Sequence, residues 1–91
     1  MQFLCILTDK PNSNALRMAT RPKHLEHLEK IKGKIVVCGP QLADDGQTMI
    51  GSMFVFEVPD RAAAEALVKS DPYAQAGLFE STVIRAFKRF I

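Results

Sequence analysis

The chain has few of the residues from which many protein sites are built. Its 91 residues include no tryptophan, one tyrosine, two cysteines and two histidines. Two cysteines do not form a disulfide framework, and two histidines with two cysteines inside apolar runs are too few for a metal site. We therefore expect no metal and no other cofactor, and we expect buried, reduced thiols in a cytoplasmic protein.

Long apolar runs and a strong net charge are also missing. No stretch is long enough to cross a membrane, and the first residues, Met1 to Cys5, show no basic leader, so neither a membrane span nor a secretory signal is predicted. The net charge of +2 does not indicate nucleic acid or a membrane as a partner. With 47% apolar residues, the chain is expected to fold as one domain over residues 1–91.

Short apolar runs bounded by turn residues predict the strands. Three such runs occur, at residues 2–7, 34–39 and 49–58, and residues 79–90, which are mixed in pattern and basic at the end, are predicted as a fourth strand. Asp44-Asp45-Gly46, between the second and third runs, is typical of a hairpin turn because Asp-Gly tolerates a positive φ.

Two helices are expected between the strands. Pro22 interrupts the first helical segment, and proline favours the first turn of a helix, so a helix is predicted over about residues 20–32, after a shorter helical piece over 13–19. Asp60 is a plausible N-cap for a second helix over residues 60–69. The order βαββαβ, with right-handed crossovers, predicts a ferredoxin-like α+β fold: a four-stranded antiparallel sheet with both helices on one face.

The sheet is expected to have a second apolar face. The first three strand segments are apolar at successive positions rather than alternating, yet two helices cover only one face of a sheet. The other face therefore needs a cover, and for a chain of this length a second copy is the simplest one. We predict a homodimer packed through the open sheet face; a monomer that exposes some apolar surface is the alternative.

RNA-binding domains share this element order, and their third strand carries a basic residue and stacking aromatics at fixed positions. Here Gly51, Phe54 and Val55 fit the pattern, but Ile50 replaces the basic residue, and Ser52 and Glu57 replace two aromatics. No glycine-rich loop opens a helix to bind phosphate. The sequence therefore favours a small-molecule substrate over nucleic acid.

Both histidines fall on the helix after Pro22. At about 100° per residue, His24 and Arg21 share the face of the apolar stripe formed by Leu25 and its neighbours, whereas His27 points away from it. A histidine and an arginine on a core-facing stripe need polar partners or a cleft. A histidine bonded to a backbone carbonyl at the core edge is the alternative to a functional imidazole.

Asp71 is the best candidate partner for His24. It precedes Pro72, which makes it an ordinary N-cap of a short helical turn, and a carboxylate has a second oxygen to offer. A contact with His24 would fix the tautomer of the imidazole and make it a general acid or base near neutral pH.

A series of short motifs resembles the YciI (YCII-related) family. The resemblance spans nearly the whole chain and rests on these segments: Asn14-Ala15-Leu16-Arg17, Thr20-Arg21-Pro22-Lys23-His24-Leu25, Gly39-Pro40-Gln41-Leu42, Gly51-Ser52, Asp71-Pro72-Tyr73 and Ala76-Gly77-Leu78-Phe79. It implies a domain of the dimeric α+β barrel superfamily with a histidine–aspartate pair as its candidate active site.

The resemblance also implies roles for individual residues. His24 and Asp71 match the catalytic pair, in a pocket under the first helix. The remaining matches are an anion or phenolate site at Arg21 and Arg17, pocket walls at Ser52 and at Gly39-Pro40, and positions near the entrance at Tyr73 and Phe79. His27 stands where the family commonly has an aromatic residue, which would reshape the pocket mouth.

Two functions follow from these residues. The first is a small cofactor-independent enzyme, a lyase or isomerase acting on an aromatic or enol substrate. Because some relatives are linked to dehydrochlorination of chlorinated hydroxyquinols, that reaction is its most concrete form. The second is a non-enzymatic ligand-binding or accessory dimer in which His24 and Asp71 are structural. An open pocket with the imidazole about 3 Å from the carboxylate would favour the first.

Overall fold

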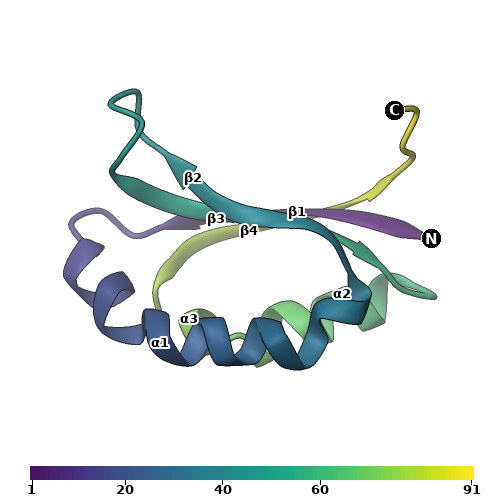
Figure 1. The fold of residues 1–91 in the computed structure, drawn as a ribbon, viewed down its shortest axis with the longest axis horizontal. Helices are drawn as coiled ribbons and strands as arrows, with labels where there is room; N and C mark the ends of the chain where they lie inside the picture. The colour runs from purple at the N-terminus through teal and green to yellow at the C-terminus, as the bar shows by residue number, and fades with distance from the viewer.

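The protein is described here by a computed structural model of residues 1–91, in which helices cover one face of a four-stranded sheet (Figure 1). The elements are β1 (Gln2–Asp9), α1 (Asn14–Ile31), a 3₁₀ turn (Lys32–Lys34), β2 (Ile35–Leu42), β3 (Met49–Glu57), α2 (Arg61–Ser70), α3 (Pro72–Gln75) and β4 (Phe79–Phe87).

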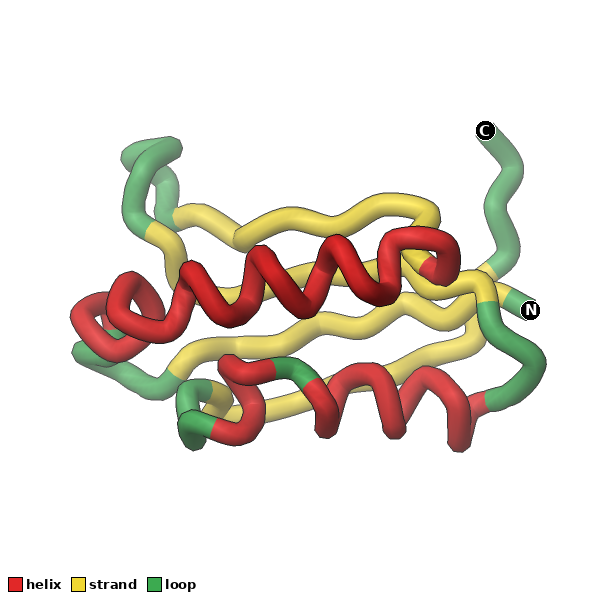
Figure 2. Tube along the Cα trace, turned by 60° about the horizontal axis from the view of Figure 1, so that its bottom comes forward, coloured by secondary structure: helices red, strands yellow, loops and turns green.

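The strands run in the spatial order β2-β3-β1-β4, and every neighbouring pair is antiparallel. Figure 2 shows α1 and α2 lying next to each other across the same face of the sheet. The predicted ferredoxin-like arrangement is therefore confirmed.

The first helix differs from the prediction. α1 is one continuous helix from Asn14 to Ile31 with Pro22 inside it, so the expected new start near residue 20 after a separate piece was wrong. Proline removes one backbone hydrogen bond and crowds the preceding turn, which commonly bends a helix without ending it. Figure 1 shows the first turns of α1 at an angle to the rest. These turns place Arg17 over one end of the sheet.

Three strand boundaries also differ from the prediction. β1 continues to Asp9 and β2 to Leu42, whereas β4 ends at Phe87, before the last residues of the predicted run. The extension of β1 matters most, because it brings a carboxylate, Asp9, to the edge of the core.

The core lies between the sheet and the helices. Phe3, Cys5 and Leu7 of β1 alternate onto this face beside Phe54 and Phe56 of β3. Each fully buried side chain of this size contributes about 1.5–3 kcal/mol of hydrophobic stabilisation. The rest of the core comes from α1, α2, the outer strands and the residue that follows β3: Val58, Ala64, Val68 and Ile84, with Leu28, Ile31 and Ile35 packed against them.

The opposite face of the sheet has no helix over it (Figure 1). Its side chains are also apolar, and several are partly exposed, including Val37 at 48% and Val83 at 38%. The last residues, Phe90 and Ile91, are exposed too, and Figure 1 shows the C-terminal segment rising on this side.

Two predicted local signals are present. The Asp60 carboxylate accepts a hydrogen bond from the Ala63 backbone N–H and caps α2. Gly46 has a φ of 71° in the turn between β2 and β3, a conformation that favours glycine. No helix of the chain is long and apolar enough to span a membrane.

Candidate active site

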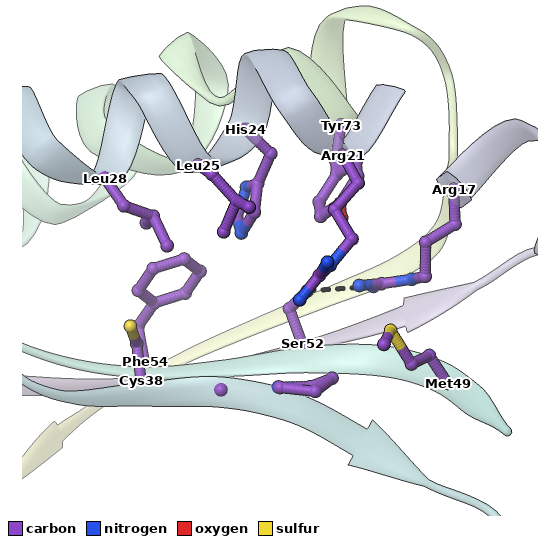
Figure 3. Close-up of a pocket in the computed structure, with 12 residues that line it drawn as sticks. Arg17, Arg21, His24, Leu25, Leu28, Cys38, Met49, Ser52, Phe54 and Tyr73 are labelled. Atoms are coloured by element: carbon purple, nitrogen blue, oxygen red, sulfur yellow. Dashed lines mark hydrogen bonds between the residues drawn. The ribbon is translucent and has the colours of Figure 1, made fainter. Parts of the chain in front are cut away.

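A cavity of about 180 Å³ lies between α1 and the end of the sheet formed by β2 and β3 (Figure 3). An engineered apolar cavity of roughly 150 Å³ binds benzene, so this volume suits one substituted ring. The walls come from α1, α3, β2 and β3: Arg17, Arg21, His24, Leu25, Leu28, Cys38, Gly39, Pro40, Met49, Ser52, Phe54 and Tyr73.

His24 and Asp71 are in contact at the buried side of this cavity. His24 Nδ1 lies 2.9 Å from Asp71 Oδ1, and the two residues are 8% and 2% exposed. The same Oδ1 also accepts a hydrogen bond from the Tyr73 backbone N–H at 2.9 Å. Asp71 is therefore both the predicted N-cap of α3 and a partner of His24.

This contact determines which imidazole nitrogen is available. A carboxylate oxygen only accepts, so His24 Nδ1 carries the proton in the contact. His24 Nε2 has no hydrogen-bond partner within the protein, and the imidazole lines the cavity. A neutral His24 thus offers an unshared electron pair on Nε2 to a molecule in the cavity, which is the arrangement of a general base.

The Tyr73 ring packs against His24 on one side and lies beside Arg17. The His24 and Tyr73 rings are stacked with centroids 4.0 Å apart and an interplanar angle of 20°. Arg17 Cζ lies 4.4 Å from the centre of the Tyr73 ring, within the range of a cation–π contact. Phe54 contacts the imidazole edge-on, with ring centroids 6.4 Å apart.

Arg17 is already engaged by protein groups. Its Nε and Nη2 donate to the two carboxylate oxygens of Asp9 at 2.7 and 2.9 Å. Nη2 also donates to Ser52 Oγ at 2.8 Å, the bond marked in Figure 3. Arg17 is 1% exposed and Asp9 9%. Sequence reasoning missed Asp9, since nothing in the sequence distinguishes this carboxylate from the other acidic residues that end strands or turns.

Arg21 differs from Arg17. It is half-buried and lines the cavity, and none of the ion pairs of the chain includes it. Of the two arginines that the sequence indicated, Arg21 is the one whose guanidinium is left for a ligand. Figure 3 shows its side chain directed from α1 toward Ser52.

The environment of Tyr73 and Cys38 changes their acidity. Burial raises the pKa of the Tyr73 phenol, and Asp71 also raises it, while the Arg17 and Arg21 guanidinium groups lower it. Burial and, less strongly, Asp71 raise the pKa of the Cys38 thiol. Both groups are therefore held in their neutral forms.

The other predicted residues divide between the cavity wall and its surroundings. Ser52, Tyr73, Gly39 and Pro40 line the cavity, as expected. Phe79 does not line it; its ring packs edge-on to Tyr73, with centroids 6.3 Å apart. Cys38, which we expected in the core, is half-buried: it packs against the core and also forms part of the cavity wall.

Gln41 and Gly51 fix the backbone of β3 next to Ser52. The Gln41 side-chain amide donates to the carbonyl oxygens of Leu7 and Ser52, at 3.1 and 2.9 Å. It passes over Gly51, where a Cβ would lie 2.4 Å from the Leu7 oxygen. The backbone on which Ser52 sits therefore requires glycine at position 51.

Fold and cavity together define a ferredoxin-like α+β domain with a buried histidine–aspartate pair facing a cavity the size of one ring. The YCII-related domain is recognised over residues 1–88, and the chain belongs to that family.

Related proteins cover the chain almost end to end. It is 30% identical to the protein YciI of Escherichia coli strain CFT073 over 96 residues, 98% of each chain. A Haemophilus influenzae protein is 26% identical over the same share.

Among solved structures, the chain is similar to the 5-chloro-2-hydroxyhydroquinone dehydrochlorinase TftG of Burkholderia phenoliruptrix, in complex with 2,5-dihydroxybenzoquinone. The two share 34% identity and a TM-score of 0.91, over 99% of this chain and 96% of the other. An antibiotic biosynthesis monooxygenase, 13% identical with a TM-score of 0.56, shares the fold.

Proposed function

We propose that the protein is a cofactor-independent enzyme that removes a proton from a small aromatic or enol substrate, with elimination or isomerisation following. The observation that carries the proposal is the orientation of His24: Nδ1 is held by Asp71 at 2.9 Å, and Nε2 is left unpartnered at the cavity wall. A purely structural histidine would have both nitrogens satisfied or enclosed.

The roles of the other residues follow from their contacts. Asp71 keeps the Nδ1 proton on His24 and stabilises the imidazolium that forms after proton transfer. Arg21, which has no partner in the protein, would hold a phenolate or enolate oxygen of the substrate. Apolar walls from Leu28, Met49 and Phe54 suit a single planar ring.

The most concrete reaction is dehydrochlorination of a chlorinated hydroxyquinol. The support is the 34% identity and near-complete superposition with a dehydrochlorinase of 5-chloro-2-hydroxyhydroquinone. In this reaction His24 Nε2 takes the proton of a ring hydroxyl and passes it to the carbon that bears chlorine, so that the O–H electron pair becomes part of a C=O bond and that carbon becomes tetrahedral. Loss of a second hydroxyl proton to His24 forms a second C=O bond, and the displaced ring electrons expel chloride with the electrons of the carbon–chlorine bond. The net change is loss of HCl and formation of a quinone. Arg21 would stabilise the negative charge on the ring oxygen during the transfer.

A chloride-release assay with 5-chloro-2-hydroxyhydroquinone tests the proposal. We expect His24→Gln to lower kcat by about 10²–10⁴-fold, the usual contribution of a general base. His27→Gln is the matched control, because His27 lies on the same helix but outside the cavity wall. Equal turnover in the two variants would contradict the assignment. Binding without chloride release by the wild type would favour the alternative, a ligand-binding or accessory protein.

We also propose that two copies pair through the open sheet face. That face carries a groove of about 520 Å³ with an almost entirely apolar lining: Leu4, Val36, Val37, Met53, Val55, Phe87, Arg89 and Ile91. Contiguous exposed apolar surface of this kind is typical of an interface.

We also propose that the protein works in the cytoplasm, because its two cysteines are unpaired thiols, which is the usual state of cysteines in that compartment.

Light scattering coupled to size-exclusion chromatography tests the dimer. Val37→Lys places a charge in the open face and is expected to shift the mass from dimer to monomer. Met18→Lys is the matched control, since Met18 is also 48% exposed but lies on α1. A wild-type mass of one chain at micromolar concentration would contradict the proposal.

A further inference from the structure

Asp9 and Arg17 form a second buried ion pair near the cavity. The contact between His24 and Asp71 does not depend directly on it, since neither Asp9 nor Arg17 is hydrogen-bonded to these two residues. The Asp9 and Arg17 side chains are almost fully buried, at 6% and 2% exposure. A buried ion pair loses about as much free energy to desolvation as it gains from attraction, so it is weak support for the stability of a fold. Its position beside the cavity suggests another role.

Asp9 and Ser52 together fix the plane of the Arg17 guanidinium. Nε and Nη2 form a two-pronged contact with the Asp9 carboxylate at the end of β1, and Nη2 reaches Ser52 Oγ on β3. A guanidinium held at both prongs by one carboxylate cannot rotate without losing a hydrogen bond. Its orientation is therefore fixed relative to the sheet.

This fixed cation lies against the ring that packs on His24. Arg17 Cζ is 4.4 Å from the Tyr73 centroid, and the Tyr73 ring is stacked on the imidazole at 4.0 Å. Figure 3 shows Arg17, Tyr73 and His24 one after another beneath α1. The bond to Asp71 restrains the imidazole at Nδ1 only and allows the ring to tilt about that contact. The face of Tyr73 restricts this tilt.

We propose that Asp9 is a positioning residue for His24, acting through Arg17 and Tyr73. Asp71 sets the tautomer of the imidazole, and the row from Asp9 to Tyr73 sets its tilt and so the direction of Nε2. The proposal rests on the proposed function in that the direction of Nε2 matters because this atom takes the proton.

Proton NMR of the two imidazoles tests the positioning. In the wild type, the Tyr73 ring current shifts the His24 C–H signals away from those of His27, at a pH where both rings are neutral. We expect Asp9→Asn to move the His24 signals toward those of His27 and to leave His27 unchanged. Glu57→Gln is the matched control, because it breaks an exposed ion pair with the N-terminus and Glu57 does not line the cavity.

Asp9→Asn leaves the buried Arg17 guanidinium without its counter-charge, and this variant could fail to fold for that reason alone. A second variant is therefore needed. Asp9→Asn/Arg17→Gln removes both charges, so it is expected to regain thermal stability while the His24 signals stay displaced. A structural role would return stability and the His24 signals together. Wild-type His24 signals in the folded variants would overturn the proposal.

Kinetics separate this proposal from the proposed function. A displaced base costs about 10²-fold in rate, so Asp9→Asn is expected to lower kcat by about that factor with KM little changed. If the His24 signals move but the wild type releases no chloride, the positioning stands and the proposed function fails. If the wild type releases chloride and Asp9→Asn changes neither kcat nor the His24 signals, the positioning fails and the proposed function stands.

Discussion

Asp71 and Asp60 form a natural pair for measuring what Asp71 does beyond capping a helix. Each accepts one backbone N–H bond at a helix N-terminus, but only Asp71 also contacts a histidine, and only Asp71 is buried. Replacing an N-cap by alanine costs about 1 kcal/mol. Asp60→Ala is therefore expected to lower the free energy of unfolding by about 1 kcal/mol.

Asp71→Ala loses more than a cap. It also removes the acceptor of a buried imidazole N–H, which costs about 1–3 kcal/mol when the donor is left unpaired. The expected total is about 2–4 kcal/mol. Asp71→Ser keeps a capping hydroxyl but is too short to reach His24, so its cost should fall between the other two. Asp71→Asn retains an acceptor oxygen for both bonds and should cost least.

Urea unfolding measures these differences. Tyr73 is the single tyrosine and the chain has no tryptophan, so fluorescence reports on the residue next to the pair. With an m-value of about 1 kcal/mol per M, as for small domains, a difference of about 2 kcal/mol separates the alanine variants by about 2 M in midpoint. All proteins are compared at one chain concentration, because a dimer is stabilised by mass action. Equal losses for Asp71→Ala and Asp60→Ala would refute the reasoning.

Four further predictions concern the cavity and its support. Burial raises the pKa of the Tyr73 phenol, and the Arg21 guanidinium partly offsets this by lowering it. Arg21→Gln should therefore raise the Tyr73 pKa further, as measured by tyrosinate absorbance. An unchanged titration would mean that Arg21 does not act on Tyr73. Because its pKa is raised in the folded protein, the contribution of Tyr73 to stability is complete below its pKa in the unfolded chain, near 10, and is lost as the pH rises above that value. Unfolding curves measured at increasing pH should show this loss, and unchanged stability above pH 10 would contradict it. Burial raises the pKa of the Cys5 thiol to about 11 and also raises that of the Cys38 thiol. Only Cys38 lines the cavity, so alkylation followed by mass spectrometry should modify Cys38 first. Modification of Cys5 first would contradict this. Gly51→Ala would place a Cβ 2.4 Å from a carbonyl oxygen of β1 and should lower the melting temperature, whereas Gly39→Ala, with open space at its Cβ, is the control.

The fold was predictable because its signals are local. Short apolar runs, an Asp-Gly turn and the Asp60 cap each act over a few residues, and the order of strands and helices leaves few arrangements. The direction of His24 also follows from local geometry, since the turn of an α-helix places it on the same side as Leu25 and Leu28. Pro22 misled the prediction because a proline bends some helices and starts others, and neighbouring packing decides between the two.

The polar contacts of the site were less predictable. Asp9 meets Arg17 because β1 runs longer than its apolar run and the first turns of α1 bend back over its end. This is a tertiary arrangement that charge spacing does not encode. The same holds for Phe79, which the resemblance placed near the cavity entrance and the structure places behind Tyr73. Residue types suggested the chemistry, but the packing of β1 against α1 decides which arginine remains for a ligand.

The central claim is that His24 presents an unprotonated Nε2 to the cavity because Asp71 holds the proton on Nδ1. Nitrogen NMR of protein labelled with ¹⁵N-histidine measures this directly, at a pH where both imidazoles are neutral, with His27 as the internal reference. We predict the Nδ1–H tautomer for His24 in the wild type and its loss in Asp71→Ser. An Nε2–H tautomer for His24 in the wild type would contradict the account, because the proposed base would already carry the proton that it is meant to accept.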